Sequence, residues 1–214
     1  MLTFLLPAVL AGCSGEREPF PQGGKAGLRI ESCSSRGGTD GSPTLVKDFG
    51  MVLLDDTGGG YAGAVNPLHV TYGEGWIFPE VTLTETPCRL FAFSPFAAIP
   101  GKELPLSLVP QTDYLASGEI RLDWQNRSAD IGMEHLLCLL EFTIEGSSAC
   151  TLSVEDVPTG GTYGLAGGKL SAGEKGTVPS EGNTLLLLPG KAGNNRVVIR
   201  FQAVSYTHLT LPTN

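Results

Sequence analysis

Residues 133–144, Met-Glu-His-Leu-Leu-Cys-Leu-Leu-Glu-Phe-Thr-Ile, carry the strongest strand signal in this sequence of 214 residues. Side chains of an extended chain alternate between its faces, and one face here is apolar throughout: Leu136, Cys138, Leu140, Phe142 and Ile144. Leu137 and Leu139 on the other face are apolar too, which predicts a central strand covered on both sides. A helix over 134–140 is the competing interpretation, because leucine suits both structures. The aromatic and β-branched residues of 142–144 favour the strand.

Similar short apolar runs continue on both sides of this segment, separated by turn residues. We predict strands near 28–31, 49–54, 61–72, 76–78, 81–83, 89–93, 185–188 and 197–201, and a glycine-rich loop from 158 to 180. Only 17% of the residues are charged, whereas glycine (29) and proline (15) are abundant. That composition favours turns over long helices with charged faces. The sequence therefore predicts an all-β protein built from antiparallel β-sandwiches.

The N-terminus has the features of an export signal. Residues 2–11 form an apolar run that is too short to span a bilayer but suits a signal peptide. The run ends in Leu10-Ala11-Gly12-Cys13, which resembles a bacterial lipobox. We therefore expect a lipoprotein signal peptide over 1–12, lipidation of Cys13 and a tether over 13–27, with an ordinary signal peptide as the alternative. No Lys or Arg precedes the apolar run, so we expect Met1 to be an internal methionine.

The C-terminus carries a segment of a different kind. Residues 204–213, Val-Ser-Tyr-Thr-His-Leu-Thr-Leu-Pro-Thr, resemble the conceptual translation of an adapter used in sequencing libraries. A genuine amphipathic strand is the alternative. We expect 204–214 to be such an artefact and the native sequence to stop near Ala203. His208 then has no part in any mechanism.

Few residue patterns suggest catalysis. Asp56-Thr57-Gly58 resembles the active-site loop of an aspartic protease, but that chemistry needs two carboxylates that share a proton, and the sequence holds no second copy. The run 55–60, Asp-Asp-Thr-Gly-Gly-Gly, is more typical of a hairpin turn. His135 beside Glu134 and the isolated His69 lack a partner motif. We expect no enzyme activity, no cofactor and no metal.

The charge of the sequence narrows the possible partners. The net charge is −8 and no cluster of Lys and Arg is present, which excludes the usual nucleic-acid interface.

Besides Cys13 the sequence holds Cys33, Cys88, Cys138 and Cys150. Four cysteines in an exported protein allow three disulfide pairings. The predicted core position of Cys138 favours unpaired core cysteines for most of them instead.

Several segments, in order, resemble the fimbrillin family of pilus subunits and anchors from Gram-negative anaerobes. The segments are Phe49-Gly50, Asn66, Trp76, Leu90-Phe-Ala-Phe-Ser-Pro95, Gln111-Thr-Asp-Tyr-Leu-Ala-Ser117, Met133 to Phe142, Val157 to Tyr163 and Leu185 to Pro189. The resemblance runs from Leu28 to Phe201. The Trp-Gly-Tyr pattern near the family's C-terminus is absent here.

The resemblance implies two transthyretin-like β-sandwiches in tandem, the first over 28–156 and an incomplete second over 157–203. It also implies a structural subunit or anchor of an adhesive surface filament, held in the outer membrane by lipid. Its partners would be other pilus subunits, bound by donor-strand exchange, and a surface receptor. A protease would cut after an arginine near the first strand, either Arg29 or Arg36. The alternative is a surface glycan-binding lipoprotein, for which Trp76, Trp124 and Tyr163 are the candidate sugar platform.

Overall fold

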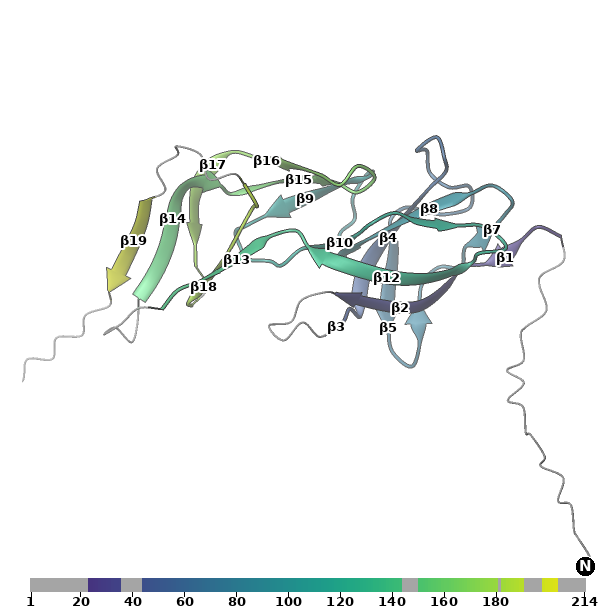
Figure 1. The fold of residues 1–214 in the computed structure, drawn as a ribbon, viewed down its shortest axis with the longest axis horizontal. Coiled ribbons are helices and arrows are strands. Elements are labelled where there is room, and N and C mark those ends of the chain that lie inside the picture. Colours follow the sequence, from purple (N-terminus) through teal and green to yellow (C-terminus); the bar gives the residue numbers. More distant parts are fainter. Residues whose placement is uncertain (1–22, 36–43, 144–149, 181, 191–197, 204–214) are drawn as a thin grey trace, which may run out of the picture.

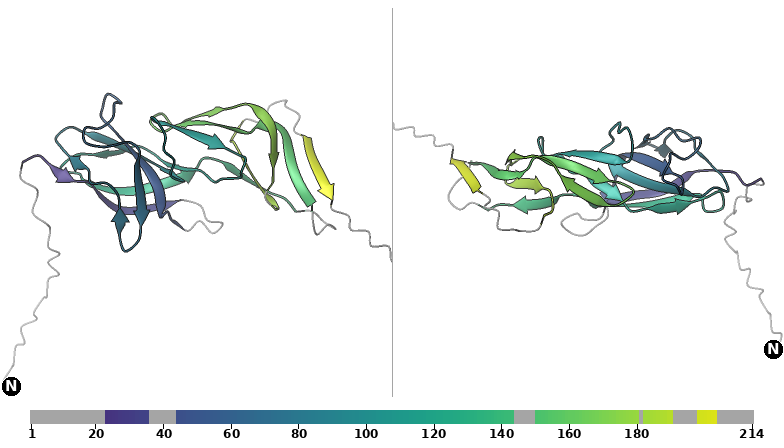
Figure 2. Two further views of the ribbon diagram at one scale, coloured as in Figure 1. Left: turned by 180° about the vertical axis from the view of Figure 1, so that it is seen from behind. Right: turned by 90° about the horizontal axis from the view of Figure 1, so that it is seen from above.

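A computed structural model describes residues 23–35, 44–143, 150–180, 182–190 and 198–203. Within these ranges the chain forms nineteen strands and no helix, so the all-β prediction is confirmed. No helix there is long and apolar enough to cross a membrane. The strands form an elongated molecule with one group of sheets at each end of its long axis (Figures 1 and 2).

The N-terminal end is a single curled, nine-stranded sheet with the order β3-β2-β12-β10-β8-β4-β5-β6, and with β11 beside β8. Its strands are β2 (Arg29–Ser35), β3 (Thr44–Leu45), β4 (Asp48–Leu54), β5 (Leu68–Tyr72), β6 (Trp76–Ile77), β8 (Cys88–Ser94), β10 (Leu115–Ser117), β11 (Ile120–Leu122) and β12 (Ser128–His135). A separate short pair joins β1 (Ala26–Gly27) to β7 (Thr82–Leu83). Every pairing in the large sheet is antiparallel except that between β12 and β2, which is parallel.

The curled sheet is buried on two sides. Its inner face packs around a core that includes Phe49, Met51, Leu53, Val70, Leu90, Ile131 and Met133. The opposite face of β4 and β8 is also covered, and it contributes Val52, Leu54, Phe91 and Phe93 to a second cluster. That cluster is completed by Leu104 and Leu106, so β4 and β8 are apolar on both faces because both faces are buried.

The C-terminal end consists of three small sheets. β9 (Glu103–Ser107), β15 (Gly160–Gly164) and β16 (Lys169–Ala172) form one; β14 (Cys150–Pro158), β17 (Lys175–Pro179) and β19 (Val198–Ala203) form another; and β13 (Cys138–Glu141) pairs with β18 (Thr184–Leu187). β9 lies between β8 and β10 in the sequence, yet it pairs with β15. The predicted division between residues 156 and 157 falls inside β14.

Two local predictions are corrected by these strands. The predicted loop 158–180 contains β15, β16 and β17. Its glycines serve close strand packing, since a Cβ on Gly160 would lie 2.4 Å from the Leu106 carbonyl oxygen and one on Gly161 would lie 2.3 Å from that of Ser171. The predicted strand 61–72 is extended only over β5.

The predicted single strand 133–144 is wrong, because β12 ends at His135 and β13 begins at Cys138. Between them Leu136 donates its amide to the Tyr114 carbonyl and Leu137 is buried. The chain thus leaves the large sheet and enters a small one. All four residues of β13 are exposed, Cys138 among them, which corrects the predicted core position of Cys138.

Candidate functional site

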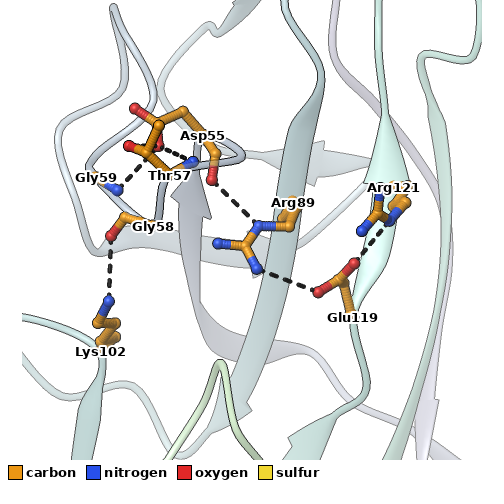
Figure 3. Close-up of polar contacts among 8 residues, drawn as sticks. All are labelled: Asp55, Thr57, Gly58, Gly59, Arg89, Lys102, Glu119 and Arg121. Atoms are coloured by element: carbon orange, nitrogen blue, oxygen red, sulfur yellow. Dashed lines mark hydrogen bonds and ion pairs between the residues drawn. The ribbon is translucent and has the colours of Figure 1, made fainter.

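The turn after β4 is organised by Asp55 rather than by the Asp56 of the protease-like triplet. One Asp55 carboxylate oxygen accepts hydrogen bonds from the Thr57 hydroxyl at 2.6 Å, the Thr57 amide at 2.8 Å and the Gly59 amide at 2.9 Å (Figure 3). The Thr57 hydroxyl and then the Gly59 amide lower the pKa of Asp55 from its ordinary value. Asp56 is exposed. The residues 55–60 form the predicted hairpin turn.

Charged side chains fasten this turn to its surroundings. Arg89 Nε donates to the Asp55 carbonyl at 3.1 Å, and Lys102 Nζ donates to the Gly58 carbonyl at 3.2 Å (Figure 3). Glu119 lies 3.5 Å from Arg89 and 2.8 Å from Arg121. These contacts bind the turn to β8 and to the segment before β9, which is a structural role.

The two described histidines lie in separate surface pairs. His69 Nε2 is 3.1 Å from an Asp48 carboxylate oxygen, and its ring stacks on Phe96 at 4.0 Å between centroids. His135 Nδ1 lies 2.8 Å from an Asp113 carboxylate oxygen. Across the ranges that the structure describes, no group of three or more His, Cys, Asp and Glu side chains is placed to hold a metal ion.

The structure does not bring the candidate sugar-binding aromatics together. Trp76 packs against the inner core and makes edge contacts with Phe49 at 5.7 Å and Tyr72 at 4.7 Å. Tyr163 packs against the cluster on the other side of β4 and β8, where burial and then the Glu134 carboxylate raise its pKa. Trp124 is half-buried and donates its amide to the Thr84 carbonyl.

The cysteines also differ from one another in environment. Cys33 and Cys88 are fully buried, unpaired members of the inner core, as predicted. Burial raises the pKa of each thiol to about 12. The Cys138 thiol is unpaired and exposed, whereas the side chain of Cys150 lies outside the described part of the chain.

An apolar hollow lies beside β13, where Leu139 is 55% exposed and Leu140 is 41% exposed. It has a volume of about 410 Å³ and is lined by Leu137, Leu139, Leu186, Asp113 and His135. The most exposed apolar side chains of this hollow lie on β13, whereas on β18 Leu185 is fully buried and Leu186 and Leu187 are half-buried.

The arrangement around β2 is the most distinctive in the molecule. β2 lies between β12, with which it pairs in parallel, and β3, with which it pairs antiparallel. The Val46 amide extends the second contact by donating to the Cys33 carbonyl at 3.1 Å. We call the space that β2 fills, between β12 and residues 44–46, the β2 slot. Its two walls come from distant parts of the chain.

The side chains of β2 divide clearly between core and solvent. Ile30, Cys33 and Ser35 are buried at the inner face. On the outer face the Ser32 hydroxyl donates to Asp130 at 2.9 Å, and the Ser128 hydroxyl donates to Glu31 at 2.9 Å. β2 therefore covers one side of the inner core, while Glu31 and Ser32 on its outer face bond to polar groups of β12.

The residues predicted for processing lie at or beyond the ends of this strand. Arg29 is the first residue of β2, and its amide donates to the Arg127 carbonyl at 2.9 Å. Arg36 follows the last residue of β2 directly in sequence, but it lies outside the described residues, as does Cys13. Sequence reasoning missed the pairing of β2 with β12, because Ser32 and Asp130 are 98 residues apart. One local signal was present: the apolar residues Ile30 and Cys33 are three positions apart, whereas a regular strand places inward residues two apart.

No family model matches the sequence, and no curated protein matches it. Among the solved structures similar to this chain are three candidate cell adhesion proteins. That from Bacteroides uniformis ATCC 8492 has a TM-score of 0.61 and 16% identity, covering 85% of this chain and 81% of its own. Those from Bacteroides ovatus ATCC 8483 and Bacteroides thetaiotaomicron VPI-5482 have TM-scores of 0.49 and 0.48, at 13% and 12% identity. The match to the Bacteroides ovatus protein covers 82% of this chain and 84% of that protein. The match to the Bacteroides thetaiotaomicron protein covers 84% of each chain.

Proposed function

We propose that the protein is a structural subunit or anchor of a fimbria-like filament on the cell surface and acts in adhesion. The observation that carries this proposal is the β2 slot, in which one strand is held between two walls and plugs the core. The fold shared with the Bacteroides uniformis candidate adhesion protein supports it. So does the resemblance of the sequence to fimbrillins.

The slot suits strand exchange between subunits. If β2 were withdrawn, β12 would present an unpaired backbone edge, and the inner core would lose the cover of Ile30 and Cys33. An extended strand from another subunit satisfies both needs, because its backbone completes the ladder and its side chains fill the core. Such a strand is the partner that we propose for this site.

The position of the cut decides whether β2 can leave. A cut after Arg36 separates β2 from β3, since Arg36 lies between Ser35 and Thr44 in the sequence. A cut after Arg29 leaves residues 30–35 covalently joined to β3. Of the two predicted processing sites, we therefore propose Arg36.

Anchoring completes the proposal. Lipidation of Cys13 would hold the uncut protein in the outer membrane, since acyl chains contribute about 0.8 kcal/mol for each buried CH₂ group. A cut after Arg36 separates this anchor from the residues that follow, so cut copies would form the filament and an uncut copy would anchor it. The filament would then project from the cell toward a surface receptor. With a net charge of −8, nucleic acid is not among the proposed partners.

The test compares two arginine variants in the native host, where companion subunits are present. We expect the wild type and Arg29→Ala to form detergent-resistant ladders on unheated gels. Arg36→Ala should remain uncut and leave no ladder. Ladders that persist in Arg36→Ala would contradict the proposed site, and a cut protein that stays monomeric among its companions would contradict the filament role.

A further inference from the structure

We infer that the β2 slot selects its partner strand by side-chain size. From its N-terminus, the strand that it accepts turns three side chains inward: a large aliphatic one, then a small uncharged one three positions later, then a second small one two positions after that. The residues between them point outward, and the strand runs parallel to β12. This inference rests on the proposed function and names the class of strand that the same site accepts.

The sizes follow from the residues of β12 that face β2 across the ladder. Ile30 lies opposite Ala129, Cys33 opposite Ile131 and Ser35 opposite Met133. All three β12 residues are at most 1% exposed. At each position a large residue thus meets a small one. Close-packed cores tolerate neither an added side chain nor an unfilled space at such positions.

The spacing follows from an irregularity in the ladder. The register shifts between Ala129 and Asp130, so that β2 has one more residue than β12 at this point. The inward residues of β2 are therefore three apart from Ile30 to Cys33 and two apart from there to Ser35. A strand with strict alternation would turn the wrong side chain inward over part of the slot.

The direction follows from the same size match. Over Cys33–Ser35 the strand is flanked by β12 and by residues 44–46, whereas among the described strands Arg29–Ser32 pairs only with β12. A strand of the same sequence in the reversed direction would place its large residue opposite Met133 and a small one opposite Ala129.

The experiment uses the full chain with a specific protease site inserted between Arg36 and Pro43. After cleavage, a fluorescent peptide with the sequence of residues 28–35 is exchanged into the slot in mild urea, and unlabelled peptides compete for it. We expect the peptide changes Ile30→Ala, Cys33→Leu and Ser35→Leu to weaken competition about tenfold or more. The matched controls are Cys33→Ala and the outward change Ser32→Ala, which should stay within about twofold. A peptide of reversed sequence should compete poorly.

A size swap provides the second arm. In protein that carries Ile131→Ala, the Cys33→Leu peptide should compete better than the unchanged peptide, because leucine fills the space that isoleucine left. Thermal unfolding before cleavage shows whether this variant is folded. If it is not, the peptide series alone decides.

Equal competition by all the peptides, stronger binding of the reversed peptide, or no exchange at all would overturn the inference. These outcomes are distinct from those of the filament test. If exchange depends on side-chain size but the protein forms no filament, the inference stands and the proposed function is wrong. If filaments form but exchange does not depend on side-chain size, the proposed function stands and the inference is wrong.

Discussion

The side-chain amide of Gln111 bonds both backbone groups of Leu186, from 75 residues away, as the backbone of a neighbouring strand would. Gln111 Nε2 donates to the Leu186 carbonyl at 3.4 Å and to the Leu108 carbonyl at 2.7 Å, and Oε1 accepts from the Leu186 amide. Since β13 pairs with the other edge of β18, Gln111 satisfies the backbone groups of Leu186 that point away from β13.

Replacing Gln111 by alanine should therefore destabilise the protein. The half-buried Leu186 would lose the partners of two backbone groups, for which we expect a loss of about 1–2 kcal/mol in the free energy of unfolding. Urea unfolding of the full chain measures it. The control is Gln125→Ala, because Gln125 is exposed and its backbone amide alone makes the bond to Asp123. Equal effects of the two changes would contradict the role of the amide.

The buried thiols predict a loss of stability in alkaline solution. The pKa of Cys33 and of Cys88 rises from 9.0 to about 12 on folding, so above pH 9 the unfolded chain releases protons that the folded protein retains. The free energy of unfolding is therefore at its full value below pH 9. As the pH rises from 9 toward 12 it falls by about 1.4 kcal/mol per pH unit for each buried thiol.

The measurement is the free energy of unfolding at several pH values between 8 and 11. We expect a shallower decline in the double variant Cys33→Ala and Cys88→Ala than in the wild type. Cys138→Ala, which removes an exposed thiol, should decline as the wild type does. Parallel curves for the wild type and the double variant would refute the prediction.

The exposed leucines of β13 predict a surface that binds apolar molecules. Leu139→Lys should lower the fluorescence of a bound hydrophobic dye and reduce aggregation, with less than about 0.5 kcal/mol change in stability, because the side chain is 55% exposed. Leu137→Lys places the same charge at a buried neighbour and should unfold this end. A dye signal unchanged by Leu139→Lys would place the apolar surface elsewhere.

The N-terminal motif predicts lipid attachment at one residue. In a host that processes lipoproteins, the protein should incorporate labelled palmitate. Cys13→Ser should abolish the label, since no other cysteine follows the sequence Leu-Ala-Gly. Cys138→Ser is the matched control and should keep it. A label that survives Cys13→Ser would exclude this lipidation site.

The sequence predicted the parts of the fold that depend on local alternation. The apolar runs 49–54 and 89–93 became β4 and β8, and the turn at 55–60 formed as expected. The failure at 133–144 has a physical reason, because periodicity reports that a chain is extended but not where it passes from one sheet to another. Glycine misled the prediction for 158–180, where close strand packing and not a loop requires it.

The candidate site was less accessible to sequence reasoning. Arg29 and Arg36 stand at the two ends of β2 in the sequence, but nothing local identifies β12 as the parallel partner of β2. The complementary sizes of Ile30 with Ala129 and of Ser35 with Met133 become visible only when the register is known. Pairing between distant strands depends on the complementary sizes of facing side chains, which the apolar periodicity of a sequence does not report.

The placement of β9 determines how the molecule would carry a pulling force. β9 leaves the N-terminal sheet and pairs with β15 over five residues, from Ser107 opposite Gly160 to Glu103 opposite Gly164. Both strands run close to the long axis (Figure 1). Tension along that axis would load their hydrogen bonds in shear, so that the bonds must fail together and not one after another. The two ends are thus joined by this ladder as well as by the short stretch of chain between β12 and β13, and the ladder would resist stretching along the long axis.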